Sequence, residues 1–573
     1  MKKIFFGKLF GLTILMFMLL FTGASAEMYE GTGLGYDKDG IVLDVEIKDS
    51  KITDVKVKRA KESEFATPAI QEIAKKVIAT QSLDVDGISG ASLTSEGTKE
   101  AIEEAVKKSG ITLTTVTVQN VRTVEFPKET DVVVIGAGGA GLTSAIAAHE
   151  KGAKVILIEK TELLGGNTNY ATAGLNAAGT KIQEKLGVKD SPELFYEDTM
   201  KGGKNKNNKE LVRVLVNNSS AIVDWLIERG ADLSELTSTG GQSAKRTHRP
   251  TGGTAVGPNI VAALSKTAEN EKIDIRKGTK AIALVKTKNR IVGVKVREID
   301  GKEYTIKAKA VIVATGGFGA NAKMVEKYNP KLKGFGSTNS PAIVGDGIIM
   351  VEKVGGALVD MSEIQTHPTV VHNKTNMITE AVRGEGAILV NRDGKRFIDE
   401  LETRDVVSKA ILSQKGKSAF LIFDEDIRTK LKAADGYVKK GFAVEGTLEE
   451  IAAKIGTDAK TLEATLNKYN EAVRNKVDSE FNKKTLPKEL TGTKYYAIEV
   501  SPAVHHTMGG VRINTNAEVL GKNGRPIKGL YAAGEVTGGI HGANRIGGNA
   551  VADITIFGKI AGENAAIYSK SVK

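Results

Sequence analysis

The distribution of apolar side chains along the chain predicts three kinds of secondary structure. Residues 41–47 and 52–57 are β-rich runs separated by a short polar turn, which indicates a hairpin. Residues 68–80 and 96–109 place apolar side chains at helical spacing and predict two amphipathic helices. Apolar runs predict the buried strands of a larger domain, and they begin at Val132, Val155, Ala310 and Leu530.

The first residues follow a different pattern. Lys2, Lys3 and Lys8 precede an apolar run over residues 9–21, and small residues follow it up to Ala26. This order is typical of a secretory signal peptide over residues 1–26, so we expect export to the periplasm or to the extracytoplasmic face of the cell membrane. The alternative is an uncleaved membrane anchor, for which the apolar run is short.

Composition narrows the classes of function. A length of 573 residues with 41% hydrophobic residues allows several domains, each with its own core. The absence of cysteine excludes disulfides, a lipoprotein-type acylated cysteine, iron–sulfur ligation and covalent c-type haem, and we expect no haem and no metal site. The net charge of +12 is spread among interleaved acidic and basic residues, which favours a solvated surface over nucleic-acid binding.

A glycine-rich turn over residues 136–141 connects the first of the apolar strands to a predicted helix. Gly136 permits a tight turn, Gly138 lets the backbone approach a pyrophosphate, and Gly141 lets helix and strand pack closely. The pyrophosphate is then expected at the helix N-terminus, where unpaired N–H groups favour negative charge. Glu159 ends the next strand and is expected to accept hydrogen bonds from ribose hydroxyls. The pattern predicts a dinucleotide-binding unit.

Residues 86–94 read Asp-Gly-Ile-Ser-Gly-Ala-Ser-Leu-Thr. This run resembles the signature of the FMN-binding domain of electron-transfer proteins, including subunits of the sodium-pumping quinone reductase. The resemblance covers residues 27–110 and implies one FMN per chain, carried covalently on Thr94 through a phosphoester that a flavin transferase forms. The alternative is a Gly/Ser/Thr turn before a helix capped by Ser95. Residues 111–126 are the expected linker.

Further segments resemble the FAD-binding fold shared by succinate dehydrogenase, L-aspartate oxidase and soluble fumarate reductases. The resemblance rests on residues 164–168, 171–175, 310–317 and 530–535 and extends over residues 127–573. It implies one non-covalent FAD per chain. The FAD contacts implied, including those of the glycine-rich turn, are Gly136, Ala137, Gly138, Gly139, Ala140, Gly141, Glu159, Lys160, Gly166, Asn167, Thr168, Ala173, Gly174, Thr315, Gly316, Asp346, Glu535, Asn549 and Ala550.

Other segments narrow the resemblance to flavocytochrome c-type fumarate reductases. They are residues 365–369, 377–384, 402–405, 504–510 and 541–545. In that family a clamp domain closes over the flavin. The implied fold class is α/β, a Rossmann-like FAD-binding domain (127–361 and 506–573) with an inserted α+β clamp domain (362–505), preceded by a small α+β FMN-binding domain. An FMN domain stands where haem-bearing members carry haems, which leaves the electron donor open. We expect a membrane or extracellular donor, either quinol-linked or a flavin shuttle.

The resemblance also implies how a proton reaches the substrate. Arg404 is the implied general acid, and Glu380 and Arg383 are implied to supply it with protons. An arginine acid is unusual because the group is rarely deprotonated. It becomes plausible as one link of a relay that reprotonates it in a closed site. Taken alone, Arg383 and Glu380 also fit a helix-face ion pair, and Arg404 fits a surface pair with Asp405 or Glu402.

Reduction of an activated C=C bond places developing negative charge on a carboxylate, which cations and neutral donors stabilise. The resemblance assigns His506 and Arg545 to one carboxylate and His367 and Thr379 to the other. The planar fork of an arginine matches a carboxylate with two parallel hydrogen bonds. His505 is interpreted as a structural neighbour of His506.

The sequence therefore predicts an exported, membrane-associated fumarate reductase of anaerobic respiration that passes electrons from FMN through FAD to fumarate. One alternative keeps the chemistry but reduces urocanate, acrylate, methacrylate or cinnamate. Another is a flavin electron carrier without ene-reductase activity. Two predicted carboxylate-binding pairs favour an unsaturated dicarboxylate as the small-molecule partner.

Overall fold

The computed structural model describes residues 26–35, 40–62, 66–88, 91–116, 128–288, 290–374 and 376–572. The predicted signal peptide lies outside these residues apart from Ala26, and the predicted linker lies within them only as far as residue 116. Across the described ranges, no helix combines the length and apolar character needed to cross a membrane.

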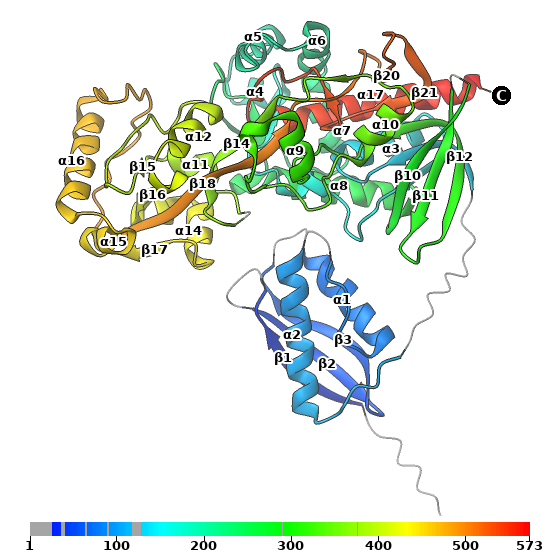
Figure 1. Ribbon diagram of the computed structural model, residues 1–573, viewed down its shortest axis with the longest axis horizontal. Helices are drawn as coiled ribbons and strands as arrows, with labels where there is room; N and C mark the ends of the chain where they lie inside the picture. Colours follow the sequence, from blue (N-terminus) through cyan, green and yellow to red (C-terminus); the bar gives the residue numbers. More distant parts are fainter. Residues whose placement is uncertain are drawn as a thin grey trace, which may run out of the picture.

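The N-terminal unit is an antiparallel three-stranded sheet with two helices against it (Figure 1). Its elements are β1 (Glu27–Gly33), β2 (Ile41–Lys48), β3 (Lys51–Ala60), α1 (Thr67–Thr80) and α2 (Ser92–Ser109). The predicted hairpin is confirmed, since β2 pairs with β3 through Val45 opposite Val55. Apolar side chains from the sheet and both helices form one core, separate from the cores of the rest of the chain.

Helix α2 begins earlier than the sequence predicts, at Ser92 instead of residue 96. Ser95 does not cap it. The Ser95 hydroxyl donates to the Ala91 carbonyl at 2.9 Å and accepts from the Ile88 N–H at 2.9 Å, so it ties the preceding loop to a helix already formed. Thr94 consequently lies in the first turn of α2.

The larger body is organised around a mixed sheet in the order β10-β11-β21-β12-β4-β5-β9, with β20 paired to β21. Strand β4 lies between β5 and β12 and runs parallel to both, with Ile135 opposite Ile158 and Val313. Because β5 and β12 flank β4 on opposite sides and run parallel to it, a crevice is expected at the carboxyl end of β4. The strands are β4 (Glu129–Ile135), β5 (Val155–Ile158), β9 (Asp274–Arg276), β10 (Thr279–Thr287), β11 (Arg290–Glu298), β12 (Glu303–Val313), β20 (Glu518–Leu520) and β21 (Pro526–Ala532).

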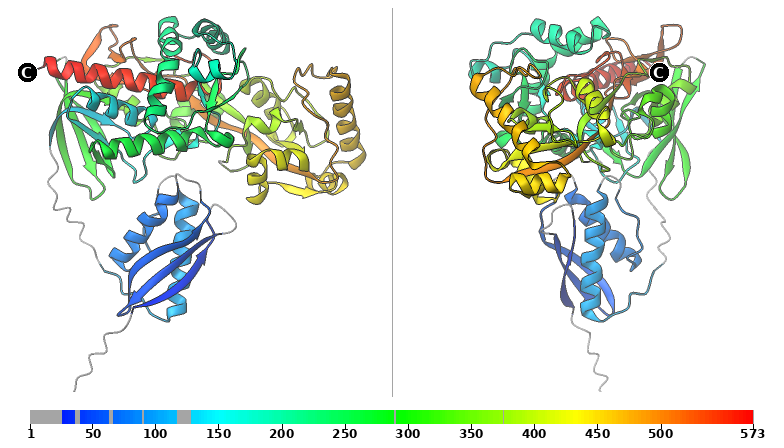
Figure 2. Two further views of the ribbon diagram at one scale, coloured as in Figure 1. Left: turned by 180° about the vertical axis from the view of Figure 1, so that it is seen from behind. Right: turned by 60° about the vertical axis from the view of Figure 1, so that its left-hand side comes forward.

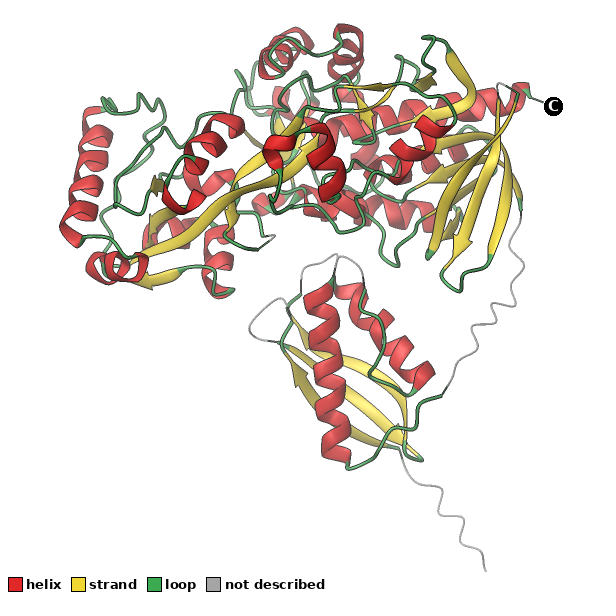
Figure 3. Cartoon of the chain, in the orientation of Figure 1, coloured by secondary structure: helices red, strands yellow, loops and turns green. Residues whose placement is uncertain are grey.

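Helices and two small sheets cover this central sheet (Figures 1 and 3). The helices are α3 (Gly139–Glu150), α4 (Lys181–Lys185), α5 (Pro192–Gly202), α6 (Lys209–Asn217), α7 (Ser219–Glu228), α8 (Val256–Asn270), α9 (Ala322–Tyr328), α10 (Asp346–Lys353) and α17 (Asn549–Ser571). The small sheets contain β6 (Leu175–Asn176), β7 (Glu235–Thr237) and β8 (Thr247–Arg249), and β13 (Leu358–Val359), β19 (Gly510–Arg512) and β22 (Thr537–Gly538).

A second sheet with its own helices lies at the other end of the body (Figure 2). Its strands are β14 (Ile364–Val371), β15 (Ile388–Val390), β16 (Ala419–Asp424), β17 (Val444–Gly446) and β18 (Tyr495–Thr507). Its helices are α11 (Glu380–Gly384), α12 (Arg404–Leu412), α13 (Glu425–Lys430), α14 (Lys432–Lys439), α15 (Leu448–Ile455) and α16 (Ala459–Asn475). Its hydrophobic core is distinct from that of the central sheet.

Strand β18 joins the two parts of the body. Val500 belongs to the core of the second sheet, whereas Val504 belongs to the core of the central sheet. His505 and His506 therefore lie where the two parts meet. The fold is therefore α/β, with an α+β part inserted between β13 and β19 and a small α+β unit before β4.

Candidate active site

The glycine-rich turn lies at the carboxyl end of β4, and its glycines differ in what surrounds them. Gly136 has a φ of 98°, which favours glycine. A Cβ on Gly141 would lie 1.7 Å from the Gly136 carbonyl oxygen, so only glycine lets the helix pack here. A Cβ on Gly138 would meet the Gly165 carbonyl oxygen at 3.6 Å, an ordinary contact, so packing within the protein does not require glycine there.

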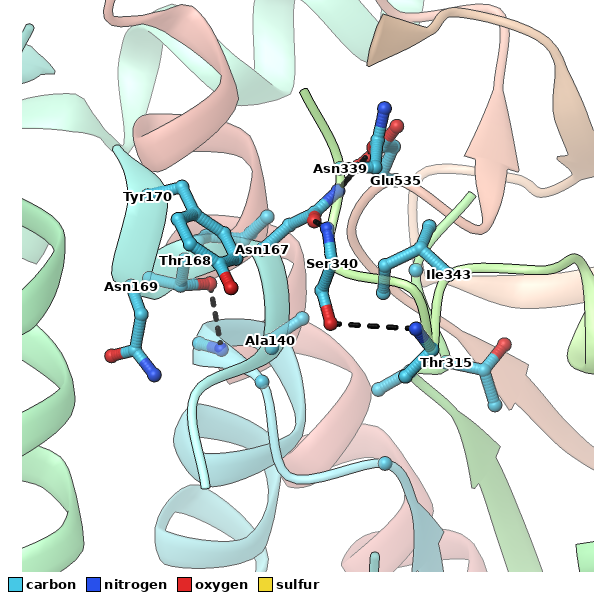
Figure 4. A pocket seen from close by; sticks show the side chains of 18 of the residues that line it. Ala140, Asn167, Thr168, Asn169, Tyr170, Thr315, Asn339, Ser340, Ile343 and Glu535 are labelled. Atoms are coloured by element: carbon cyan, nitrogen blue, oxygen red, sulfur yellow. Dashed lines mark hydrogen bonds between the residues drawn. The ribbon is translucent and has the colours of Figure 1, made fainter. Parts of the chain in front are cut away.

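Residues of the turn line a large cavity that continues over residues 158–174 and 338–343 (Figure 4). Asn167 organises one wall, since its side chain donates to Asn339 Oδ1 at 2.5 Å and accepts from the Ser340 N–H at 2.9 Å. Glu159 Oε2 accepts a hydrogen bond from the Ala137 N–H at 2.8 Å. Helix N-terminal N–H groups, small residues and a carboxylate at the end of the next strand are the groups that a dinucleotide requires, so these residues fit FAD.

Most of the predicted FAD contacts line this cavity, but three do not. Ala137 contributes through its N–H to Glu159, Gly141 packs under the turn, and Asn549 is bonded to Asn176 at 2.6 Å. Those that line it are Gly136, Gly138, Gly139, Ala140, Glu159, Lys160, Gly166, Asn167, Thr168, Ala173, Gly174, Thr315, Gly316, Asp346, Glu535 and Ala550.

The structure adds Thr338, Asn339 and Ser340 to the cavity wall, which the sequence analysis missed. No glycine pattern marks this segment. Its position depends on hydrogen bonds to Asn167, which is distant in the sequence.

The predicted proton-relay residues lie together where α11 and α12 approach the cavity. Arg404 Nε donates to Glu380 Oε1 at 2.6 Å, and Arg404 Nη1 donates to Gln365 Oε1 at 3.2 Å. Arg383 Nη2 lies 3.7 Å from the same Glu380 oxygen. Arg404 lines the cavity, whereas Glu380 and Arg383 lie behind it. The surface pair of Arg404 with Asp405 is absent, because Asp405 pairs with Lys204 at 2.6 Å.

The two arginines of this cluster determine the pKa of the Glu380 carboxyl. Burial acts to raise its pKa, but Arg404 and Arg383 outweigh burial and bring the pKa of Glu380 down to about 2. Burial lowers the pKa of Arg383, and the positive charge of Arg404 acts in the same direction. The cluster therefore holds one ionised carboxylate between two guanidinium groups.

The four histidines near the cavity form two pairs. The rings of His367 and His505 are centred 5.4 Å apart, and those of His506 and His541 are also 5.4 Å apart. His541 Nε2 lies 3.1 Å from Asp553 Oδ2. His505 and His506 are neighbours on β18 and point to different partners because side chains alternate along a strand.

His505 also faces the cavity, a position that its interpretation as a structural neighbour of His506 did not predict. It lines the cavity together with His506, Arg404 and Arg545, and its Nδ1 lies 2.8 Å from Thr338 Oγ1. The strand alternation could have suggested two different roles for the adjacent histidines.

His367 and Thr379 do not line this cavity. His367 lies on β14 and is 1% exposed. Thr379 is the N-cap of α11, where its side chain accepts from the Ala381 N–H. The assigned second carboxylate site is thus behind the cavity wall, next to His505 and Arg383.

Buried nitrogen atoms without a hydrogen-bond partner gather at this site. They are His367 Nδ1, His506 Nδ1, Arg545 Nε, and Arg383 Nε and Nη2. Burial lowers the pKa of Arg545 to about 9, and repulsion from Arg404 adds to the effect. Buried donors and unrelieved positive charge favour the binding of an anion, and carboxylates accept from such groups.

The predicted FMN attachment residue, Thr94, is 2% exposed, and its hydroxyl donates to the Glu62 carboxylate. Leu93 beside it is 51% exposed and Leu34 is 68% exposed. The hydroxyl is therefore held by a carboxylate, and its sequence neighbour Leu93 is exposed.

The FAD cavity, taken together with the family and the relatives described next, places the chain among FAD-dependent oxidoreductases that act on CH–CH bonds. The chain belongs to the family described as FAD binding domain, whose model matches residues 131–551. The model of the FMN-binding domain matches residues 35–107.

The relatives agree with this classification. The chain is 51% identical over 442 residues to a fumarate reductase (cytochrome) of Shewanella frigidimarina, which covers 77% of each protein. It is 44% identical over 534 residues to an NADH:fumarate oxidoreductase of Klebsiella pneumoniae, where the match covers 92% of this chain but only 57% of that relative. A urocanate reductase of Eggerthella lenta is 34% identical over 565 residues, 95% of this chain and 93% of that protein.

Among solved structures, the open conformation of a flavocytochrome c3 fumarate reductase matches with a TM-score of 0.70 and 44% sequence identity. The match covers 77% of this chain and 78% of that chain.

Proposed function

We propose that this protein reduces fumarate to succinate, with electrons that pass from FMN on Thr94 to FAD. The observation that carries the proposal is the Arg404–Glu380–Arg383 cluster, which lies beside buried cationic groups at the wall of the FAD cavity. When bound, reduced FAD supplies a hydride to one alkene carbon. Arg404 donates the proton to the neighbouring carbon, and Glu380 and Arg383 return a proton to Arg404.

Cationic and neutral donors near the cavity bind the substrate in this proposal. Arg545 and His506 hold one carboxylate, and His367 and Thr379 hold the other after the clamp has closed. The developing enolate charge is stabilised by groups already in place, which costs no reorganisation during the reaction. The unpartnered nitrogen atoms of Arg545 and His506 support this assignment.

The protein is further proposed to act outside the cytoplasm in anaerobic respiration. The pattern of residues 1–26 supports export, and a flavin transferase is proposed to attach FMN to Thr94. The donor to FMN is proposed to be a membrane or extracellular one, either quinol-linked or a flavin shuttle.

A second candidate keeps the reaction but changes the acid to urocanate. The match to a urocanate reductase over nearly the whole of both chains favours this candidate. The two candidates differ at the second carboxylate, which fumarate has and urocanate lacks.

Oxidation of a reduced viologen by a panel of unsaturated acids tests the proposal. Fumarate is expected to react fastest, because a monocarboxylate leaves His367 and Thr379 without an anionic partner at a cost of roughly 1–3 kcal/mol each. His367→Ala should raise the KM for fumarate and leave the monocarboxylates nearly unchanged. Faster reduction of urocanate or acrylate than of fumarate would overturn the proposal and favour the second candidate.

A further inference from the structure

One ion pair connects the N-terminal unit to the FAD-binding body. Lys76 of α1 places its Nζ 2.9 Å from Glu162 Oε2, and each side chain is 24% exposed. Glu162 lies three residues beyond Glu159, in the segment that leaves the cavity after β5. Because water is partly excluded from both side chains, this pair is screened less than a surface pair.

The same lysine also contacts the FMN motif. Lys76 Nζ donates to the Asp86 carbonyl oxygen at 3.2 Å, and Asp86 is the first residue of the motif that ends at Thr94. A single ammonium group therefore contacts both the loop that precedes Thr94 and the segment that lines the FAD cavity. Figures 1 and 2 show α1 and α2 with one end towards the body.

An apolar contact accompanies the ion pair. Leu163 of the FAD-binding body packs against the hydrophobic core of the N-terminal unit. Leu163 is also one of the residues that line the FAD cavity. One side chain thus contacts the core of the FMN-binding unit and the cavity of the second flavin.

The three residues that precede Glu162, residues 159–161, are bonded to the cavity wall or to one another. Glu159 accepts from the Ala137 N–H at 2.8 Å, and Lys160 pairs with Asp346 at 2.6 Å. Thr161 donates through its N–H to Glu159 Oε1 at 2.9 Å. Because these bonds fix the segment to the cavity wall, a unit that binds Glu162 and Leu163 is positioned relative to the cavity.

We propose that Lys76, Glu162 and Leu163 form a docking contact that holds the FMN-binding unit at the rim of the FAD cavity for electron transfer between the flavins. This inference rests on the proposed function. In each turnover FMN loses two electrons and FAD gains them, and the unsaturated acid then takes both electrons together with two protons. Lys76 acts here as a positioning residue and takes no part in the chemistry.

Cross-linking tests the contact without reference to activity. The chain contains no cysteine, so Lys76→Cys with Glu162→Cys introduces the only two thiols. A short bismaleimide should join residues 76 and 162 within one chain, as peptide mass spectrometry would detect. The matched control is Lys58→Cys with Glu162→Cys, because Lys58 lies on β3 of the same unit and pairs with Glu30 instead. Equal cross-linking of the control pair would overturn the proposed docking contact.

Charge reversal at residues 76 and 162 tests whether the docking contact supports electron transfer between the flavins. Lys76→Glu and Glu162→Lys should each slow the reduction of FAD by FMN at least about tenfold in stopped-flow measurements, and the double exchange should recover most of the rate. Wild-type rates in both single variants, or no recovery in the double variant, would contradict the proposal.

The FMN-free variant Thr94→Val separates this inference from the proposed function. In that background the reversals should leave viologen-driven fumarate reduction unchanged, since electrons enter at FAD directly. Loss of activity on reversal in this background would show that the two residues act on FAD itself, which overturns the docking role. Absence of fumarate reduction before any reversal would instead contradict the proposed function.

Discussion

Arg404 Nε donates a hydrogen bond to Glu380 Oε1 at 2.6 Å, although the two residues are 24 positions apart in the chain. Each is the first residue of its helix, α12 and α11. Arg383 approaches the same oxygen atom to 3.7 Å. Glu380 is therefore held in its charged form, and its two cationic partners differ in position, since only Arg404 reaches the cavity wall.

Substitution of Arg404 should remove most of the fumarate reduction. Arg404→Ala is expected to lower kcat by about a hundred- to ten-thousand-fold, the range of a general acid, with FAD retained. Arg474→Ala is the matched control, because Arg474 forms an exposed ion pair with Glu489 in the same part of the chain. A kcat for Arg404→Ala above about a tenth of the wild-type value would assign the proton to another group.

The buried histidines should make the protein less stable in mild acid. Burial, assisted by Arg404 or Arg545, holds the pKa values of His367, His505 and His506 well below 6.5. Between those lowered values and 6.5 the unfolded chain binds more protons than the folded one, so the free energy of unfolding falls as pH decreases below 6.5. Each histidine contributes up to about 1.4 kcal/mol per pH unit.

Denaturant unfolding between pH 5 and 8 measures this effect. The Glu380 carboxyl has a lowered pKa, so its contribution is lost only below about pH 4.5 and leaves this window unaffected. His367→Gln should reduce the slope of the free energy of unfolding against pH by the contribution of one histidine, up to about 1.4 kcal/mol per pH unit. Succinate should flatten it as well, because a bound anion favours the protonated rings. An unchanged slope in His367→Gln would contradict the assignment.

Two glycines of the turn should respond differently to alanine. Gly138→Ala should leave the stability of FAD-free protein near that of wild type, since its Cβ meets no atom closer than 3.6 Å, but should weaken FAD binding because the Cβ obstructs the pyrophosphate. Gly141→Ala should destabilise the FAD-free protein by about 3 kcal/mol through its clash with Gly136. Thermal unfolding and flavin titration decide between these outcomes, and wild-type FAD affinity in Gly138→Ala would place the pyrophosphate elsewhere.

Thr94→Val should remove the covalent FMN and leave FAD bound. Denaturing mass spectrometry of protein from a host with a flavin transferase should show the mass lower by one FMN. Thr98→Val is the control, because Thr98 lies one turn further along α2, is fully buried and donates to the Thr94 carbonyl at 2.6 Å. FMN retained in Thr94→Val, or lost equally in Thr98→Val, would refute attachment at Thr94.

A buried charge network next to the relay should be costly to break. Lys483 Nζ lies 2.9 Å from Glu400 Oε2, both side chains are 0% exposed, and the Glu400 carbonyl accepts from Arg383. Lys483→Met should destabilise the protein by about 3 kcal/mol, since it leaves part of a buried carboxylate without its partner.

The matched control for this network is an exposed pair of the same length. Lys468 and Glu480 also lie 2.9 Å apart, but their side chains are 65% and 39% exposed. Lys468→Met should cost less than about 1 kcal/mol. Urea unfolding measures both losses of stability. Equal losses in the two variants would show that burial does not increase the cost of breaking the Lys483–Glu400 pair.

The sequence by itself determined the features that depend only on residues close together in the chain. The glycines at 136, 138 and 141 and the apolar strand before them predict the dinucleotide turn, because backbone freedom and periodicity are local properties. The motif that ends at Thr94 is also a local pattern, and its resemblance to the FMN-binding signature indicated the FMN unit. The relatives named above confirm the class of enzyme that these local features predicted.

Only the tertiary structure decided which partners these residues have. Asp405 is adjacent to Arg404 in sequence, yet Arg404 bonds Glu380 and Gln365, because packing of the clamp helices against β14 brings them together. His505 lines the cavity and His367 lies behind it, which depends on how β14 and β18 pair. Such contacts depend on burial and on long-range pairing, and a local pattern of residue types contains neither.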